Sequence, residues 1–211
     1  MAFDGWSEVS FKAAIRDAAV DERIARSVCP RGAVDLAVAF HERGDALMRD
    51  AMKSAALSEM KIREKVTFGV RARIEAIADK EAVRRGTTLF ALPHLAGDGA
   101  KLIWGTADAI WEALGDPSDD INWYTKRATL SGVYGATVLF WLGDSSLENE
   151  ATWAFLDRRI ENVMQFEKVK AQVTGNEKLK PLMAGPNWLV SFIKAPTRFK
   201  PSDLPGGFGG Q

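Results

Sequence analysis

The chain has 211 residues, enough to bury the core of one domain of ordinary size. Its 28 Lys and Arg residues balance its 28 Asp and Glu residues, which argues against a strongly basic nucleic-acid-binding protein. Cys29 is the only cysteine, so the chain can form neither an intrachain disulfide nor a cysteine-rich metal site, and it fits a reducing compartment.

The N-terminal residues 1–8 show no basic region followed by an apolar run, so no secretory signal is expected. No apolar stretch in the sequence approaches the roughly 20 residues that span a bilayer. Any contact with a membrane is therefore expected to be peripheral.

Three helices are expected at the start of the chain. The first follows a cap at Ser7, the second covers residues 21–28, and the third opens at Gly32. Three helices joined by tight turns suggest a helix-turn-helix arrangement over residues 1–57.

The third of these helices is poor in bases. A DNA-reading helix needs Arg or Lys side chains that meet phosphates. The first half of this helix has Arg31 at its start but carries Asp35 and Glu42 further along. The charge pattern therefore argues against DNA binding.

Residues 60–79 have the pattern of a long charged helix. Its apolar side is expected to point inward and comprises Ile62, Val66, Val70, Ile74 and Ile77. Its bases are expected on a solvated face and comprise Lys61, Arg63, Lys65, Arg71 and Arg73. A further helix over residues 80–91 should end before Pro93.

The next two helices are the most apolar of the chain. Residues 94–114 and the helix that ends near Leu142 are apolar over more than half their circumference, so both are expected to be buried. Gly132 and Gly135 lie inside the second one, where glycine costs about 1 kcal/mol relative to alanine. They suggest close helix packing or room for a ligand, and packing is the more usual reason.

The stretch 119–127, Asp-Asp-Ile-Asn-Trp-Tyr-Thr-Lys-Arg, opens that second helix after a stop at residues 115–118. Trp123 and Arg127 are four residues apart and share a helix face. Two adjacent aromatics and two adjacent bases cannot all point inward, so Trp123 or Tyr124 is expected near the surface. An exposed aromatic beside Arg is typical of a binding hot spot. The alternative is that either aromatic anchors the core.

Residues 148–173 are expected to form a further helix, and residues 177–194 the last one, interrupted by Pro181 and Pro186. The tail 196–211 is rich in Pro and Gly and is expected to be disordered. The sequence has no internal repeat and no strand-like alternation, so the predicted fold class is all-α.

The sequence offers little chemistry for catalysis. It lacks the spacings of a zinc or di-iron site and has no phosphate-binding glycine loop followed by a helix. His94 could act as a base, but no nucleophile or acid accompanies it. Asp108 and Glu112 share a helix face without a histidine nearby, so solvated surface is the better interpretation. We therefore predict no catalytic residue, no metal and no cofactor, and favour a binding protein.

Several stretches of the chain resemble the coenzyme Q biosynthesis accessory family. The resemblance is densest from about residue 92 to 163, and it is carried by residues 108–111, 115–116, 120–127 and 152–159. It extends more weakly to residues 30–36. It implies an all-α fold similar to TetR-type regulators, with an N-terminal helix-turn-helix remnant and a C-terminal helical bundle with a lipid pocket.

The resemblance also implies a function. Members of the family are non-catalytic, bind isoprenoid or other lipids, and present quinone precursors to the di-iron demethoxyubiquinone hydroxylase late in ubiquinone biosynthesis. They form homodimers through the last bundle helices. The implied location is cytoplasmic and peripheral to the inner membrane. The alternative is a TetR-like ligand-responsive DNA-binding transcription regulator, because one fold can serve both functions.

Three sets of residues follow from this resemblance. The surface that meets the hydroxylase would comprise Asn122, Trp123, Tyr124 and Arg127. An apolar lipid pocket is expected within the bundle, residues 58–174, at Trp104, Ala107, Trp111, Val133, Ala136 and Trp141. An amphipathic membrane helix is expected over residues 175–195, at Leu182, Trp188, Leu189, Phe192 and Ile193. The alternative for this last helix is that it packs back on the bundle.

Overall fold

The computed structural model describes residues 4–77, 79–175 and 194–196. Within these residues the regular structure is entirely helical, which confirms the predicted fold class. The α-helices are α1 (Glu8–Asp17), α2 (Glu22–Val28), α3 (Ala33–Ser54), α4 (Ile62–Glu75), α5 (Lys80–Phe90), α6 (Ala96–Ala113), α7 (Ile121–Gly143) and α8 (Glu150–Gly175). Two short 3₁₀ turns, η1 (Leu57–Glu59) and η2 (Leu147–Asn149), precede α4 and α8.

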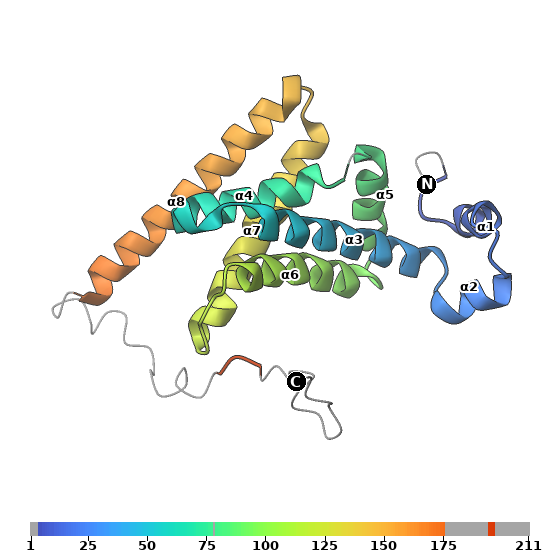
Figure 1. The fold of residues 1–211 in the computed structure, drawn as a ribbon, viewed down its shortest axis with the longest axis horizontal. Coiled ribbons are helices and arrows are strands. Elements are labelled where there is room, and N and C mark those ends of the chain that lie inside the picture. Colours follow the sequence, from blue (N-terminus) through green and yellow to red (C-terminus); the bar gives the residue numbers. More distant parts are fainter. Residues whose placement is uncertain (1–3, 78, 176–193, 197–211) are drawn as a thin grey trace.

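The first three helices begin where the sequence predicts. The Ser7 side chain accepts a hydrogen bond from the first turn of α1, and Asp21 does the same for α2. Gly32 precedes α3 with a φ of 59°, a conformation that glycine adopts without strain. Figure 1 shows α1 and α2 at one end of the molecule, while α3 continues from them into the bundle.

The core lies where α3, α4, α6, α7 and α8 meet. It is built from apolar residues at helical spacing, among them Met48, Met52, Val70, Ile110, Leu130, Tyr134 and Leu156. A side chain such as Ile110, fully buried here, contributes about 1.5–3 kcal/mol to folding. Gly69 lets α4 approach α6, because a Cβ there would lie 3.0 Å from Ile110 Cγ2.

Two expectations for α4 were wrong. Ile62 is 47% exposed, because it lies in the first turn of the helix, beyond the core. Arg73 is buried, with a side chain only 5% exposed, because Asp45 on α3 provides a partner for its charge. The other bases of this helix are exposed or partly exposed, as predicted.

Candidate functional site

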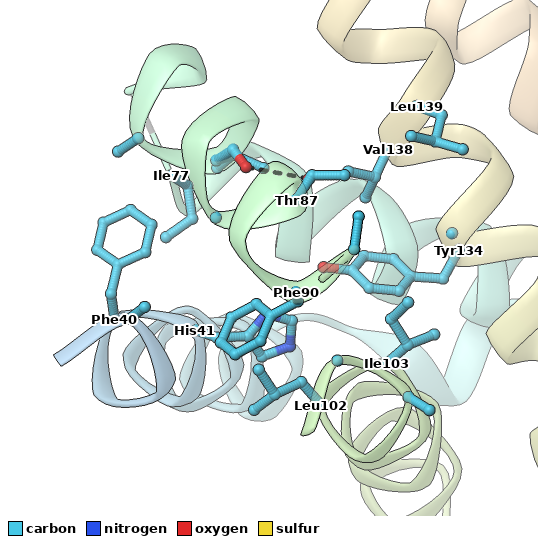
Figure 2. Close-up of a pocket in the computed structure, with 18 of the residues that line it drawn as sticks. Phe40, His41, Ile77, Thr87, Phe90, Leu102, Ile103, Tyr134, Val138 and Leu139 are labelled. Atoms are coloured by element: carbon cyan, nitrogen blue, oxygen red, sulfur yellow. Dashed lines mark hydrogen bonds between the residues drawn. The ribbon is translucent and has the colours of Figure 1, made fainter. Parts of the chain in front are cut away.

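An apolar cavity of about 440 Å³ lies between α3, α5, α6 and α7. Figure 2 shows side chains from all four helices around it, and its apolar walls include Phe40, Phe90, Leu102, Ile103, Val138 and Leu139. Its volume falls in the range of about 300–1,000 Å³ that is usual for small-molecule pockets. Gly99 brings α6 close to α5, because a Cβ there would lie 2.9 Å from Phe90 Cβ.

A buried polar network lies at one side of this cavity. Asp45 Oδ1 accepts hydrogen bonds from Arg73 Nε at 2.5 Å and from Thr106 Oγ1 at 2.8 Å. Arg73 Nη2 donates to the His41 backbone carbonyl at 2.9 Å, and His41 Nε2 lies 2.9 Å from Thr106 Oγ1. The two buried charges thus have partners, as burial of an ion requires.

Gly44 makes room for this network. A Cβ at position 44 would lie 2.5 Å from Arg73 Nη1 and 2.6 Å from its Cζ, closer than real Cβ atoms come to other heavy atoms. The guanidinium therefore lies directly against the backbone of α3.

The titratable groups beside the cavity are uncharged at neutral pH, apart from the Asp45–Arg73 pair. Burial, together with the nearby Arg73 charge, lowers the pKa of His41 to about 4. Burial also raises the pKa of Tyr134, so its hydroxyl keeps its proton. The cavity therefore offers neutral polar groups and apolar walls, a combination suited to an apolar ligand with a polar end.

A second, smaller cavity of about 260 Å³ lies between α4, α6, α7 and α8. Its lining includes Trp111, Leu130, Val133, Ile160 and Met164, with Lys126 and Arg63 as the bases among its lining residues. It lies on the opposite side of α7 from the large cavity, since different residues of that helix border each one.

The start of α7 is held by an ion cluster. Arg127 is 2% exposed and donates to Asp108 at 2.5 Å and to Asp116 at 3.0 Å. Its guanidinium also lies 4.1 Å from the centre of the Trp123 ring. Lys126 Nζ donates to the other oxygen of Asp116 at 2.7 Å. Asp108, which we interpreted as solvated surface, thus has a structural role.

The residues predicted for a partner surface differ in exposure. Asn122 is exposed and Tyr124 is half-buried, with its hydroxyl donating to the Lys194 carbonyl at 3.2 Å. Trp123 is 7% exposed, and the Arg127 guanidinium is occupied by two carboxylates. The Arg127 guanidinium is therefore engaged within this chain, although the resemblance expects Arg127 on the surface that meets the hydroxylase.

The six residues predicted to line a lipid pocket do not lie around one cavity. Trp111 and Val133 border the smaller cavity. The other four do not line either cavity: Ala107 and Trp141 are buried, Trp104 packs on Trp123 with ring centres 5.9 Å apart, and Ala136 is half-buried. The residues of α6 and α7 that border the large cavity are their sequence neighbours, Leu102, Ile103, Tyr134, Gly135, Val138 and Leu139.

Glycine was the one signal that could have identified the large cavity. Gly135 borders it, and a Cβ there would lie 4.0 Å from Ile103 Cδ1. Gly132 has no heavy atom within 4 Å of such a Cβ, so close packing does not account for it within the described residues.

The predicted membrane residues Leu182, Trp188, Leu189, Phe192 and Ile193 lie outside the described residues. In the described part of the chain, every helix is too short or too polar to cross a bilayer. In the same part, no three His, Cys, Asp or Glu side chains gather as they would around a metal ion.

The arrangement of helices defines the class of this protein: an all-α chain with the fold of TetR-type regulators. The chain is similar to the crystal structure of the TetR transcriptional regulator from Nitrosomonas europaea ATCC 19718, with a TM-score of 0.57 and 21% sequence identity. The match covers 70% of this chain and 81% of that one. At this identity the likeness shows the fold alone.

The sequence then points to a more particular relationship. Residues 96–167, which span α6, α7 and most of α8, match the COQ9 family model. The chain is 39% identical over 101 residues to "Ubiquinone biosynthesis protein COQ9, mitochondrial" of Bos taurus, and 37% identical to that of Homo sapiens. The resemblance drawn from the sequence is thereby confirmed over this segment.

The chain spans about a third of the length of these relatives. Each of the two matches covers 47% of this chain and 32% of the relative. A match to the probable coq9 protein of Dictyostelium discoideum is 31% identical and covers 56% of this chain and 38% of the relative.

Proposed function

We propose that this chain is a non-catalytic lipid-binding accessory protein of ubiquinone biosynthesis. It would bind isoprenoid quinone precursors and present them to the di-iron demethoxyubiquinone hydroxylase. The observation that carries the proposal is the apolar cavity of about 440 Å³ between α3, α5, α6 and α7. The match of α6, α7 and most of α8 to the COQ9 family model supports the pathway, as do the names of the similar COQ9 proteins.

The physical need for such a protein is clear. A long isoprenoid chain taken from a bilayer exposes many methylene groups to water, each at a cost of about 0.8 kcal/mol. Walls made by Phe40, Phe90, Leu102, Ile103 and Val138 would remove part of that chain from water. The cavity would accordingly hold part of the chain near its ring.

The partner surface is proposed at the start of α7, with fewer contact residues than the sequence suggests. Asn122 and Tyr124 have surface to offer, whereas Trp123 and Arg127 support them from below. An exposed amide and a phenol ring are suitable contacts for a protein partner.

Peripheral membrane association stays a prediction from the sequence, because Trp188 and Phe192 lie outside the described residues. An interfacial helix would place these rings among lipid headgroups. Flotation of the protein with liposomes tests it, and equal flotation of a Trp188→Ala/Phe192→Ala variant would contradict it.

We also propose a homodimer through α7 and α8. Leu139 is 62% exposed on α7 and Phe166 is 67% exposed on α8, and exposed large apolar side chains are typical of an interface.

The rival function is a DNA-binding regulator, which the fold of the Nitrosomonas europaea protein permits. Two bases near the N-terminus argue against it, because they already have acidic partners: Arg26 pairs with Glu8, and Arg31 pairs with Asp35 and Asp98. A strongly salt-dependent shift of duplex DNA would support the regulator instead.

Filling the cavity tests the lipid proposal. We expect Gly135→Leu to place a side chain in the cavity and to remove most of the lipid that co-purifies with the protein, as measured by native mass spectrometry and lipid extraction. Gly97→Leu is the matched control, because Gly97 is exposed and a Cβ there meets no atom within 4 Å. Wild-type protein that carries no lipid and takes up none from vesicles would contradict the proposal.

A further inference from the structure

The N-terminal segment of the chain contributes a side chain to the large cavity. Trp6 lies just before α1, yet it lines the cavity together with residues of α3, α5, α6 and α7. Sequence analysis predicted a helix-turn-helix-like part over residues 1–57. The start of that part therefore reaches the proposed lipid site directly.

Trp6 connects two walls of the cavity. Its ring centre lies 5.3 Å from that of Phe40 on α3, and its Nε1 donates to the carbonyl of Ala82 on α5 at 3.1 Å. Gly86, one turn further along α5, also faces the indole, since a Cβ there would lie 3.5 Å from Trp6 Nε1. Figure 2 shows Phe40 at one edge of the side chains around the cavity. The indole thus closes the cavity between α3 and α5.

The wall formed by α5 has few buried contacts of its own. Ala82 is the only residue of this helix that is buried. Lys80 Nζ donates to the Asp144 carbonyl at 2.9 Å, and Arg84 Nη2 donates to the Leu142 carbonyl at 2.7 Å. Elements held mainly by hydrogen bonds near the surface are those that open locally. The bond from Trp6 to Ala82 is therefore a substantial part of what holds this wall in place.

The position of Trp6 is set by the packing of α1. Ser10 Oγ, on α1, donates to the Gly5 carbonyl at 2.6 Å. Phe11 is 2% exposed and packs at Gly32, where a Cβ would lie 3.6 Å from its Cδ1. A ligand in contact with Trp6 would stabilise this packing, and the packing would in turn retain the ligand, because coupling between two binding events is reciprocal.

We propose that Trp6 is a binding residue of the large cavity and the gate through which its ligand leaves. The ligand is retained while the N-terminal segment is packed on the bundle, and it is released when Trp6 moves away from Phe40 and Ala82. The inference rests on the proposed lipid-binding function. It gives the N-terminal helices a role in retaining lipid instead of one in reading DNA.

The test measures how fast an apolar probe leaves the whole chain. The protein is loaded with N-phenyl-1-naphthylamine, and stopped-flow fluorescence follows its release after mixing with excess farnesol. Trp6→Phe keeps an aromatic ring and removes the donor to Ala82, so we expect release about threefold faster than in wild type. Trp6→Ala also removes the aromatic wall, so we expect release at least about tenfold faster.

Trp153→Ala is the matched control. Trp153 is also half-buried and its Nε1 also donates to a backbone carbonyl, that of Glu148 at 2.9 Å, but it lies on α8 and lines neither cavity. It should release the probe at the wild-type rate. A release rate that Trp6→Ala leaves unchanged, or that Trp153→Ala raises equally, would overturn the inference while lipid binding stands.

Amide hydrogen exchange gives a second readout that does not depend on a variant. We expect bound farnesol to slow exchange in α1 of the wild-type protein, because the ligand would stabilise the packed N-terminal segment. Equal exchange in α1 with and without bound farnesol would contradict the coupling. If wild-type protein binds neither N-phenyl-1-naphthylamine nor farnesol, the proposed function fails and this inference fails with it.

Discussion

At the scale of single residues, Arg127 has a different role from the one its neighbours in sequence suggest. It directly follows Lys126 and lies one helix turn after Trp123, a composition typical of a contact surface, yet its guanidinium is buried against Asp108 and Asp116. The loop that ends α6 is thereby fixed to the first turns of α7. Buried ion pairs are costly to break from one side only, because the remaining charge stays buried.

The clearest prediction at this scale concerns Asp116, whose side chain is 1% exposed. Burial alone would raise the pKa of this carboxyl, but hydrogen bonds from Lys126, Arg127 and Ser118 outweigh it and bring the pKa from 3.8 to about 2. The ionised Asp116 carboxylate therefore stabilises the fold fully above about pH 4, and this stabilisation is lost as the pH falls toward 2.

We expect Asp116→Asn to lower the free energy of unfolding at pH 7 by about 3–5 kcal/mol. The difference from wild type should shrink as the pH falls from 4 toward 2, because the unfolded wild-type chain binds a proton at this carboxyl more readily than the folded protein does. Urea denaturation at several pH values measures both effects, with the exposed Asp157→Asn as control. A difference that does not change with pH would show that the ion pairs are not its cause.

At the scale of the element, the first turns of α7 carry the proposed partner surface. We expect Tyr124→Ala to weaken binding of the di-iron hydroxylase at least tenfold with little loss of stability, because its ring is half-exposed. Thr125→Ala, at the exposed next position, should bind normally. Pull-down and calorimetric titration measure the effect, and unchanged binding by Tyr124→Ala would remove this surface from the proposal.

The helices and the pocket differ in how well the sequence alone predicted them. Caps, stops and apolar spacing predicted the helices of the described chain to within a few residues, because these signals are local. A pocket within the bundle was expected, but the residues that line the large cavity were not identified, because α6 and α7 are apolar over more than half their circumference. Either Trp104 or its neighbour Ile103 could have faced a ligand, and only the packing of α5 decides between them.

The buried pairing of charged residues could not be predicted from the sequence either. Arg73 lies among exposed bases on α4, and its burial depends on Asp45, which is 28 residues earlier in the sequence. Because such partners are far apart in the sequence, helical spacing does not indicate which residues pair.

At the scale of the whole molecule, the exposed apolar residues of α7 and α8 predict self-association. We expect Phe166→Glu to shift a dimer toward monomer in sedimentation velocity runs, because it would bury a charge at the interface. Leu147→Glu, at the 80% exposed η2 turn, is the control. Wild-type protein that sediments as a monomer at high concentration would rule out the dimer.

The close approach of Gly44 to Arg73 has an evolutionary consequence. Any larger residue at position 44 meets the guanidinium, yet loss of that guanidinium leaves the Asp45 carboxylate buried without a cation. Either substitution made alone is therefore expected to be destabilising. The effects of substitutions at positions 44, 45 and 73 should therefore depend strongly on one another. Related proteins that differ at one of these positions should also differ at the others.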